Sequence, residues 1–224
     1  MTKKRRLITV AFALCFGPAG AVPPRRAAAG ELPSLAGPDL ARGDYSSMHM
    51  LLQKTFLKIN VATIDVAFDK KSQGRFAALV QGRSYSDALA QQLAPIAIGT
   101  DRAVVQMQFV RDVPLNRWID VVRDNLKQAR AAGLCSGDVE KKVAAGLPQW
   151  FSALEKRGYE KGDRLLYALG PGSLRTVVIA TSGQVLLDRE EADPGVRGVV
   201  LASYFAPGSD FREPLFRSLV EHAR

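Results

Sequence analysis

The sequence contains little cysteine and little histidine, and this excludes several kinds of scaffold and site. Its 224 residues include two cysteines, Cys15 and Cys135, and two histidines, His49 and His222. Neither CxxC nor HxxxH spacing occurs, so we expect no protein-built zinc site and no other metal site. If Cys15 belongs to a cleaved leader, Cys135 stands alone, and the fold must be stable without an internal disulfide.

The motifs of several common enzyme classes are also absent. There is no G-x-S-x-G, no P-loop and no G-x-G-x-x-G. These absences argue against the common hydrolase, nucleotide-binding and dinucleotide-binding classes. We therefore expect no cofactor.

Residues 1–21 have the composition of a secretory signal. Four basic residues at 3–6 precede an apolar run at 7–16 and the small residues 19–21. The apolar run is well short of the ~20 residues that a membrane-spanning helix needs. We expect cleavage after Ala21 and a mature protein, periplasmic or secreted, without an integral membrane segment. The pair Arg5-Arg6 also resembles a twin-arginine signal, so the export route stays open.

The mature chain is only mildly basic. Without the four basic residues of the signal it has 27 basic and 22 acidic residues, a net charge of +5. It has no Lys/Arg run with interleaved aromatic residues, so nucleic acid is not an expected partner. Residues 22–44 are rich in Pro, Gly and Ala without a sustained period, which predicts a flexible leader before one domain at 45–224.

The stretch 54–69, KTFLKINVATIDVAFD, predicts one long strand, with a start as early as Met48. Apolar and polar residues alternate, but the apolar parity changes near Val61-Ala62, as a β-bulge would cause. The bulge places the polar side chains on one face; these are Lys58, Asn60, Thr63 and Asp65. That face is either the solvated side of an antiparallel sheet or the floor of a cleft beneath helices.

The clearest helix runs from Leu115 to Ala129. Its apolar residues fall at helical spacing, with charged residues on the opposite side. At ~100° per residue, Asn125 lies within about 20° of Trp118, inside the apolar stripe. Asn125 is therefore either a core amide that bonds to backbone or a donor that faces a ligand.

The other elements complete an α+β pattern with an antiparallel sheet. The expected order is a polar turn at 70–74, a helix capped by Ser84 or Ser86, a strand at 102–110, a helix capped by Ser136, a separate short segment starting at Pro148, a meander of strands at 164–169, 174–180 and 184–188, and a terminal helix opened by Asp210 and Glu213.

Three local patterns, in this order and spacing, resemble the chalcone isomerase family in its broad sense. They are Phe56-Leu57-Lys58-Ile59, then Lys161-Gly162-Asp163 before Leu165 and Tyr167, then the closing segment 198–205 with Pro214-Leu215. The family includes plant chalcone isomerases, fatty-acid-binding relatives and exported bacterial proteins of unassigned role. The resemblance covers roughly residues 47–224 and implies an open-faced β-sandwich, an antiparallel sheet with a layer of helices on one face.

The resemblance also implies a ligand site between the sheet and the helices. The Tyr and Asn that stand seven residues apart in the true isomerases fall on Trp118 and Asn125, so the Asn is kept and the Tyr is not. The strand Thr falls on Asn60, and the Arg twelve residues before it falls on Met48. Methionine cannot pair with an anion or stabilise an enolate, as arginine does. The expected ligand-binding residues are Lys58, Asn60, Trp118 and Asn125, and no catalytic residue is assigned.

We therefore expect an exported domain that binds a small hydrophobic or amphipathic ligand, similar to a fatty acid or a flavonoid, without the plant-type isomerase activity. One alternative is an active intramolecular lyase that uses Asn60 and Asn125 as donors. Another is an envelope accessory protein without a ligand. The sequence gives no prediction of the oligomeric state.

Overall fold

The computed structural model describes residues 47–54 and 59–222. The predicted signal and leader lie outside these residues, and so does Lys58. The described strands are β1 (Ser47–Lys54), β2 (Ile59–Phe68), β3 (Ala103–Phe109), β4 (Arg164–Gly170), β5 (Ser173–Ile179) and β6 (Val185–Glu191). The described α-helices are α1 (Lys70–Val80), α2 (Asp87–Ile98), α3 (Leu115–Ala131), α4 (Gly137–Trp150), α5 (Pro194–Phe205) and α6 (Arg212–His222), with a 3₁₀ turn η3 (Ser152–Leu154) after α4.

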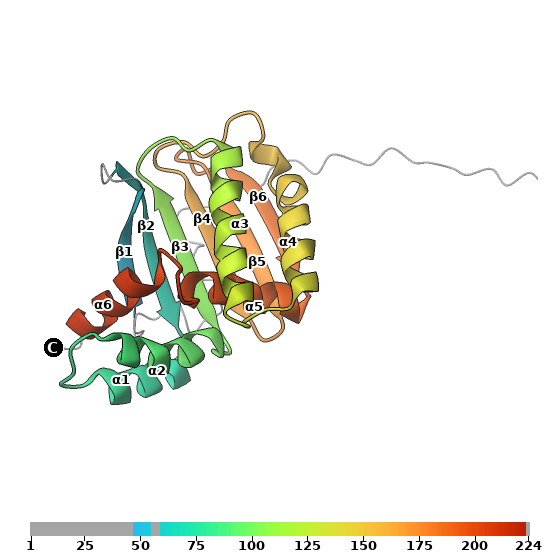
Figure 1. Cartoon of the computed structure of the whole chain (residues 1–224). Coiled ribbons are helices and arrows are strands. Elements are labelled where there is room, and N and C mark those ends of the chain that lie inside the picture. The colour runs from blue at the N-terminus through green and yellow to red at the C-terminus, as the bar shows by residue number, and fades with distance from the viewer. Residues whose placement is uncertain (1–46, 55–58, 223–224) are drawn as a thin grey trace, which may run out of the picture.

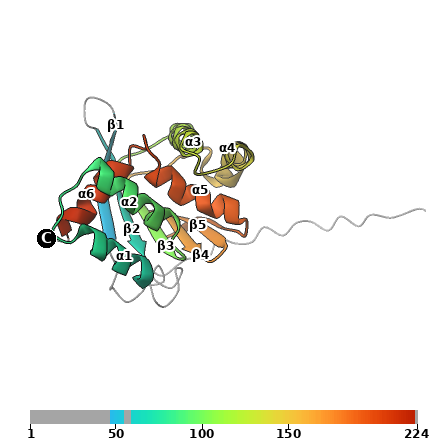
Figure 2. The ribbon, with the colours of Figure 1, turned by 60° about the horizontal axis from the view of Figure 1, so that its bottom comes forward.

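The six strands form one sheet in sequential order, and each strand is antiparallel to its neighbours. In Figure 1, α3 and α4 stand in front of the half of the sheet that contains β4 to β6, while α1 and α2 lie at one end of the strands. Figure 2 shows α3, α4 and α5 together on one side of the sheet. The expected α+β fold, an antiparallel sheet with a layer of helices on one face, is the fold observed.

Most apolar side chains of the strands point toward the helices, whereas Leu166, Val177 and Ile179 form a second, small cluster on the other face of β4 and β5. Ile64 pairs with Met107, and Met107 pairs with Leu165, so these three fully buried residues lie in one row across β2, β3 and β4. Because side chains alternate along a strand, the neighbouring pair Thr63 and Gln108 lies on the outer face. The main core is therefore confined to the space between the sheet and the helices.

The predicted bulge in the first long strand is confirmed. Leu52 pairs with Ala62 but Gln53 pairs with Asn60, so Val61 is the extra residue in β2. The prediction of one continuous strand was wrong, because Ser47–Lys54 is a separate strand that pairs antiparallel with β2. The apolar residues of both strands have the same alternation, so their sequence pattern alone did not show where one strand ends.

Two helix predictions need correction. The residues expected to form a polar turn at 70–74 are the first turns of α1, which Asp69 caps by accepting a hydrogen bond from the Ser72 amide at 2.8 Å. Pro148 does not start a separate segment, because α4 continues through it to Trp150. Proline cannot bond to the carbonyl four residues earlier, which here is Ala144 O. The Arg123 guanidinium donates to that carbonyl instead, with Nη2 at 3.1 Å and Nε at 3.3 Å.

Several other elements agree with their predictions. Helix α3 spans the predicted stripe, and Ser86 and Ser136 cap α2 and α4 by accepting backbone hydrogen bonds. The three predicted meander strands are β4, β5 and β6. The edge strand β1 contacts α6, where the His49 amide donates to Ser218 Oγ at 2.8 Å. This contact satisfies one backbone donor that an edge strand would otherwise leave open.

None of the helices within residues 47–54 and 59–222 has the length and apolar character needed to cross a membrane. In the same residues, no three His, Cys, Asp or Glu side chains are grouped so that they could hold a metal ion.

Candidate functional site

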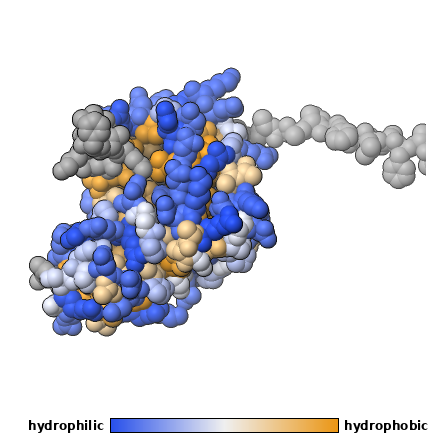
Figure 3. All heavy atoms as spheres, in the orientation of Figure 1, coloured by the Kyte–Doolittle hydropathy of each residue, from blue (hydrophilic) through white to orange (hydrophobic). Residues whose placement is uncertain are grey.

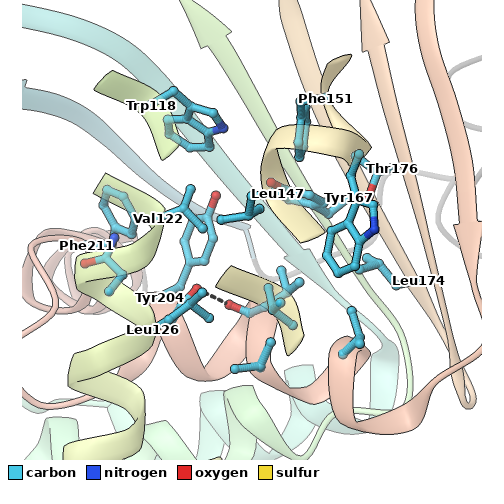
Figure 4. Close-up of a pocket in the computed structure, with 17 residues that line it drawn as sticks. Trp118, Val122, Leu126, Leu147, Phe151, Tyr167, Leu174, Thr176, Tyr204 and Phe211 are labelled. Atoms are coloured by element: carbon cyan, nitrogen blue, oxygen red, sulfur yellow. Dashed lines mark hydrogen bonds between the residues drawn. The ribbon is translucent and has the colours of Figure 1, made fainter. Parts of the chain in front are cut away.

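A cavity of about 60 Å³ lies between the sheet and helices α3, α4 and α5 (Figure 4). At roughly 30 Å³ for each water molecule, as in the liquid, it has room for about two. It is lined by Trp118, Val122, Asn125, Leu126, Val143, Leu147, Trp150, Phe151, Tyr167, Leu174, Thr176, Val196, Val199, Val200, Ser203, Tyr204 and Phe211. No charged side chain is among these residues, so the site favours an uncharged or apolar group.

The helical periodicity of α3 builds one wall of the cavity. Trp118, Val122 and Leu126 are spaced four residues apart, so they lie above one another on the side of α3 that faces the sheet. The sheet supplies the floor through Tyr167 of β4 and Thr176 of β5, which are directly paired on the helix-facing side. Sheet and helix therefore both contribute aromatic side chains to the same space.

Helix α4 contributes a tryptophan at the less buried side of the cavity. The ring of Trp150 lies so close to Gly146 that a Cβ on this glycine would approach the ring to 2.5 Å. The Arg189 guanidinium stacks on the ring at 4.1 Å from its centroid and pairs with Glu191 at 2.7 Å. Since Trp150 is only partly buried, it marks a place where the cavity approaches the surface.

Two side chains that line the cavity carry buried polar atoms without a partner. Trp118 Nε1 and Tyr204 Oη make no hydrogen bond within the described part of the chain, although these side chains are only 4% and 3% exposed. In Figure 4 the hydroxyl end of Tyr204 points into the space beside Val122 and Leu147, on the side where Trp118 lies. A buried polar group without a partner costs about 1–3 kcal/mol, so each position is a candidate contact for a ligand.

A third unpartnered group, Tyr159 Oη, belongs to the aromatic cluster that supports Trp118. The Tyr159 ring stacks on Phe109 at 4.1 Å and meets Trp118 edge to face at 5.9 Å. Phe109 also meets Trp118 edge to face at 6.0 Å. Tyr159 is held in place by a backbone bridge to Val113, with hydrogen bonds of 2.8 and 2.9 Å. The cluster fixes the orientation of the Trp118 indole.

The tyrosines around the cavity remain protonated at neutral pH. Burial raises the pKa of Tyr159 and of Tyr204 well above the usual range, and the neighbouring Tyr167 raises both further. Burial also raises the pKa of Tyr167. A protonated phenol can donate a hydrogen bond, and the indole N–H of Trp118 can only donate. The cavity therefore has several neutral donors, and it suits a hydrogen-bond acceptor.

The structure brings together two of the four predicted ligand-binding residues. Trp118 and Asn125, which are about two helical turns apart on α3, both line the cavity, and Asn125 is only 6% exposed. This supports the interpretation of Asn125 as a residue that faces a ligand site. Their binding role stays a prediction, and Lys58 is outside the described residues.

Asn60 lies elsewhere. It pairs with Gln53 beyond the bulge, so it shares the exposed outer face with Thr63 and Asp65. Asp65 Oδ1 there lies 2.7 Å from His49 Nδ1. The described part of the polar row is the solvated side of the sheet, and its interpretation as the floor of a cleft beneath helices is wrong. The apolar faces of β2 and β3 are the ones that meet the helices.

Met48 lies on the helix-facing side of β1, where it pairs with Val66 and is fully buried. It does not line the cavity. The transferred strand pair Met48 and Asn60 therefore lies on two different faces of the sheet, so these two residues do not act at one site.

Sequence analysis missed the contribution of α5 to the site. Asp193 caps this helix by accepting from the Gly195 amide at 2.7 Å, and Pro194 occupies its first turn. The spacing of the lining residues Val196, Val199, Val200, Ser203 and Tyr204 is helical. That spacing after an Asp-Pro start was a usable signal for the helix. Nothing local in the sequence shows that the Tyr204 hydroxyl would be buried without a partner.

No protein-family model matches the chain, and no curated protein matches it. Among solved structures, it is similar to the crystal structure of a fatty-acid binding protein from Arabidopsis thaliana. The TM-score is 0.49 at 15% sequence identity, over 79% of this chain and 88% of that chain. At this level of similarity, the ligand of the present chain must be deduced from its own cavity.

Proposed function

We propose that this chain is a chalcone isomerase-like binding protein that holds a small hydrophobic or amphipathic molecule between its sheet and α3, α4 and α5. One observation carries the proposal: an apolar cavity into which two buried side chains, Trp118 and Tyr204, bring hydrogen-bonding atoms without a partner. A closed protein core normally satisfies such groups. A bound molecule that covers the apolar walls and accepts a hydrogen bond would satisfy them.

Filling the cavity is expected to remove binding without unfolding the protein. Val199 on α5 lines the cavity and is buried, so the ring in Val199→Phe would occupy the space of the ligand. We expect at least a tenfold loss of affinity and a change in unfolding free energy of no more than about 1 kcal/mol. Native mass spectrometry of the full chain and the fluorescence of Trp118 and Trp150, the two tryptophans of the sequence, provide the readouts.

The matched control is Val220→Phe on α6. Val220 is equally buried but does not line the cavity, so the added ring has no space and should cost about 1–3 kcal/mol of stability. If Val199→Phe is destabilised as strongly as Val220→Phe, the cavity does not have room for the added ring or for a ligand of that size. If Val199→Phe keeps full binding, the ligand lies elsewhere and the proposal fails.

We further propose binding without the plant-type isomerase activity, and the character of the lining supports this. Among residues 47–54 and 59–222 no cationic side chain lines the cavity, so an enolate formed there would have only neutral donors from these residues as partners. The opposite result, turnover of a chalcone-type enone that is lost in Asn125→Ala, would establish the lyase alternative instead.

We also propose that the protein is exported, on the basis of its first 21 residues. The support is their basic, apolar and small-residue pattern. In a fractionated bacterial host, intact-mass measurement should show a periplasmic or secreted chain that begins at Val22. Accumulation of the uncleaved chain in the cytoplasm would contradict this proposal.

A further inference from the structure

We infer that the polar end of the ligand is an uncharged hydrogen-bond acceptor, such as the carbonyl of an ester, ketone or amide, received by Trp118 Nε1–H and Tyr204 Oη–H. This inference rests on the proposed binding function and narrows it to a class of ligand. Such a ligand differs from an ionised carboxylate or phosphate, which would need a cation as a partner, and no Lys, Arg or His is among the described lining residues.

The first reason is the type of the unpartnered atoms. An indole N–H can only donate, and a protonated phenol donates readily. Both groups belong to residues that line one apolar cavity, and a carbonyl oxygen has lone pairs to accept from them, whereas an alkyl group would leave both buried and unpartnered. An ammonium group would have no anion there, because none of the lining residues is Asp or Glu.

The second reason is the position of the neighbouring charge. The Arg189 guanidinium stacks on the ring of Trp150, and Trp150 lies at the less buried side of the cavity. Arg189 already pairs with Glu191 at 2.7 Å. The Trp118 and Tyr204 side chains are the more deeply buried ones, so a head group placed between them is away from solvent. An ion there would lose its hydration without gaining an opposite charge.

The size of the cavity also indicates in which direction the ligand lies. Room for about two water molecules accommodates a carbonyl group and the carbon next to it. The remaining carbons would extend past the partly buried lining residues Val122, Trp150 and Val200. The polar end therefore enters first, and the tail lies toward the opening.

The test compares four probes of equal or similar carbon number on the purified full chain at neutral pH, by tryptophan fluorescence with calorimetry as confirmation. The probes are methyl heptanoate, octanoate, octylammonium and octane. We expect methyl heptanoate to bind at least about fivefold more tightly than each of the others, the effect of roughly one well-placed hydrogen bond. Octanoate binding as tightly as the ester, or more tightly, would overturn the inference and leave the proposed function standing.

Variants test whether the preference for the ester depends on Trp118 Nε1 and Tyr204 Oη. Tyr204→Phe removes only the hydroxyl and should lower the affinity for methyl heptanoate about fivefold while leaving that for octane unchanged. Trp118→Phe should also lower the affinity for methyl heptanoate. Tyr85→Phe is the control, because Tyr85 stacks under Arg217 and does not line the cavity.

If none of the four probes binds to the wild-type chain, the proposed function fails as well. If the ester binds but Tyr204→Phe and Trp118→Phe lose nothing, these two donors are not its partners.

Discussion

Replacement of Asp163 by alanine is expected to lower the free energy of unfolding by about 3–5 kcal/mol, because it removes the buried acceptor of the Arg157 guanidinium and of two backbone amides. Asp163 precedes β4 and is completely buried. Its Oδ2 accepts from Arg157 Nη1 at 2.7 Å and from the Glu160 amide at 2.9 Å, and its Oδ1 accepts from the Thr181 amide at 3.2 Å. One carboxylate therefore ties the approach to β4 to the turn after β5.

The control for this prediction is another Arg–Asp pair at the surface. Arg175 donates to both oxygens of Asp188 at 2.8 and 2.7 Å, but both side chains are well exposed to solvent. Asp188→Ala should therefore cost no more than about 1 kcal/mol. Urea unfolding of the two variants beside the wild type measures the difference. A loss below about 1 kcal/mol for Asp163→Ala would show that its hydrogen bonds do not hold the turn.

The second large effect is expected at Trp118, where alanine should cost about 3–5 kcal/mol of stability. The indole packs against Phe109 and Tyr159 and closes one side of the cavity. Its removal joins the lost volume to the existing cavity, so the variant should also accept bulkier ligands than the wild type. Saturation with such a ligand should restore part of the stability, because it binds only the folded state.

Trp150→Ala is the matched comparison for Trp118→Ala. Trp150 lines the same cavity, but it is only partly buried, so its removal leaves a smaller unfilled volume. We expect it to lose less than half as much stability as Trp118→Ala. Urea unfolding with and without a bulky ester measures both quantities. Equal losses at the two tryptophans would contradict the packing role assigned to the Phe109–Tyr159 cluster.

Local periodicity was enough to predict the parts of the fold that depend on neighbouring residues. The stripe that contains Trp118 and Asn125 predicted α3, and the turns at Gly172 and Gly183, both with positive φ, separated the meander strands. The change of parity at Val61 predicted the bulge, because each face of a strand repeats every second residue. These signals do not require knowledge of any distant contact.

The errors arose where a distant partner decides the structure. Pro148 remains inside α4 because Arg123, on another helix, bonds to the freed carbonyl of Ala144. The polar row of β2 was correctly grouped, but its alternation does not say whether helices or solvent cover it. The Tyr204 hydroxyl became a site atom only because α5 packs against α3 and the sheet.

The bridge between Val113 and Tyr159 has a consequence for protein engineering. Val113 follows β3 and Tyr159 precedes β4, so the bridge joins the segments where the chain leaves the sheet and returns to it. The residues between the two bridge partners contain α3, α4 and the short 3₁₀ turn. Gly158 allows the two segments to approach this closely, since its φ is +67° and a Cβ there would lie 2.6 Å from Val113 O. Residues 115–156, which leave the Arg157–Asp163 pair in place, therefore form the natural segment to diversify when one wall of the cavity is to be changed.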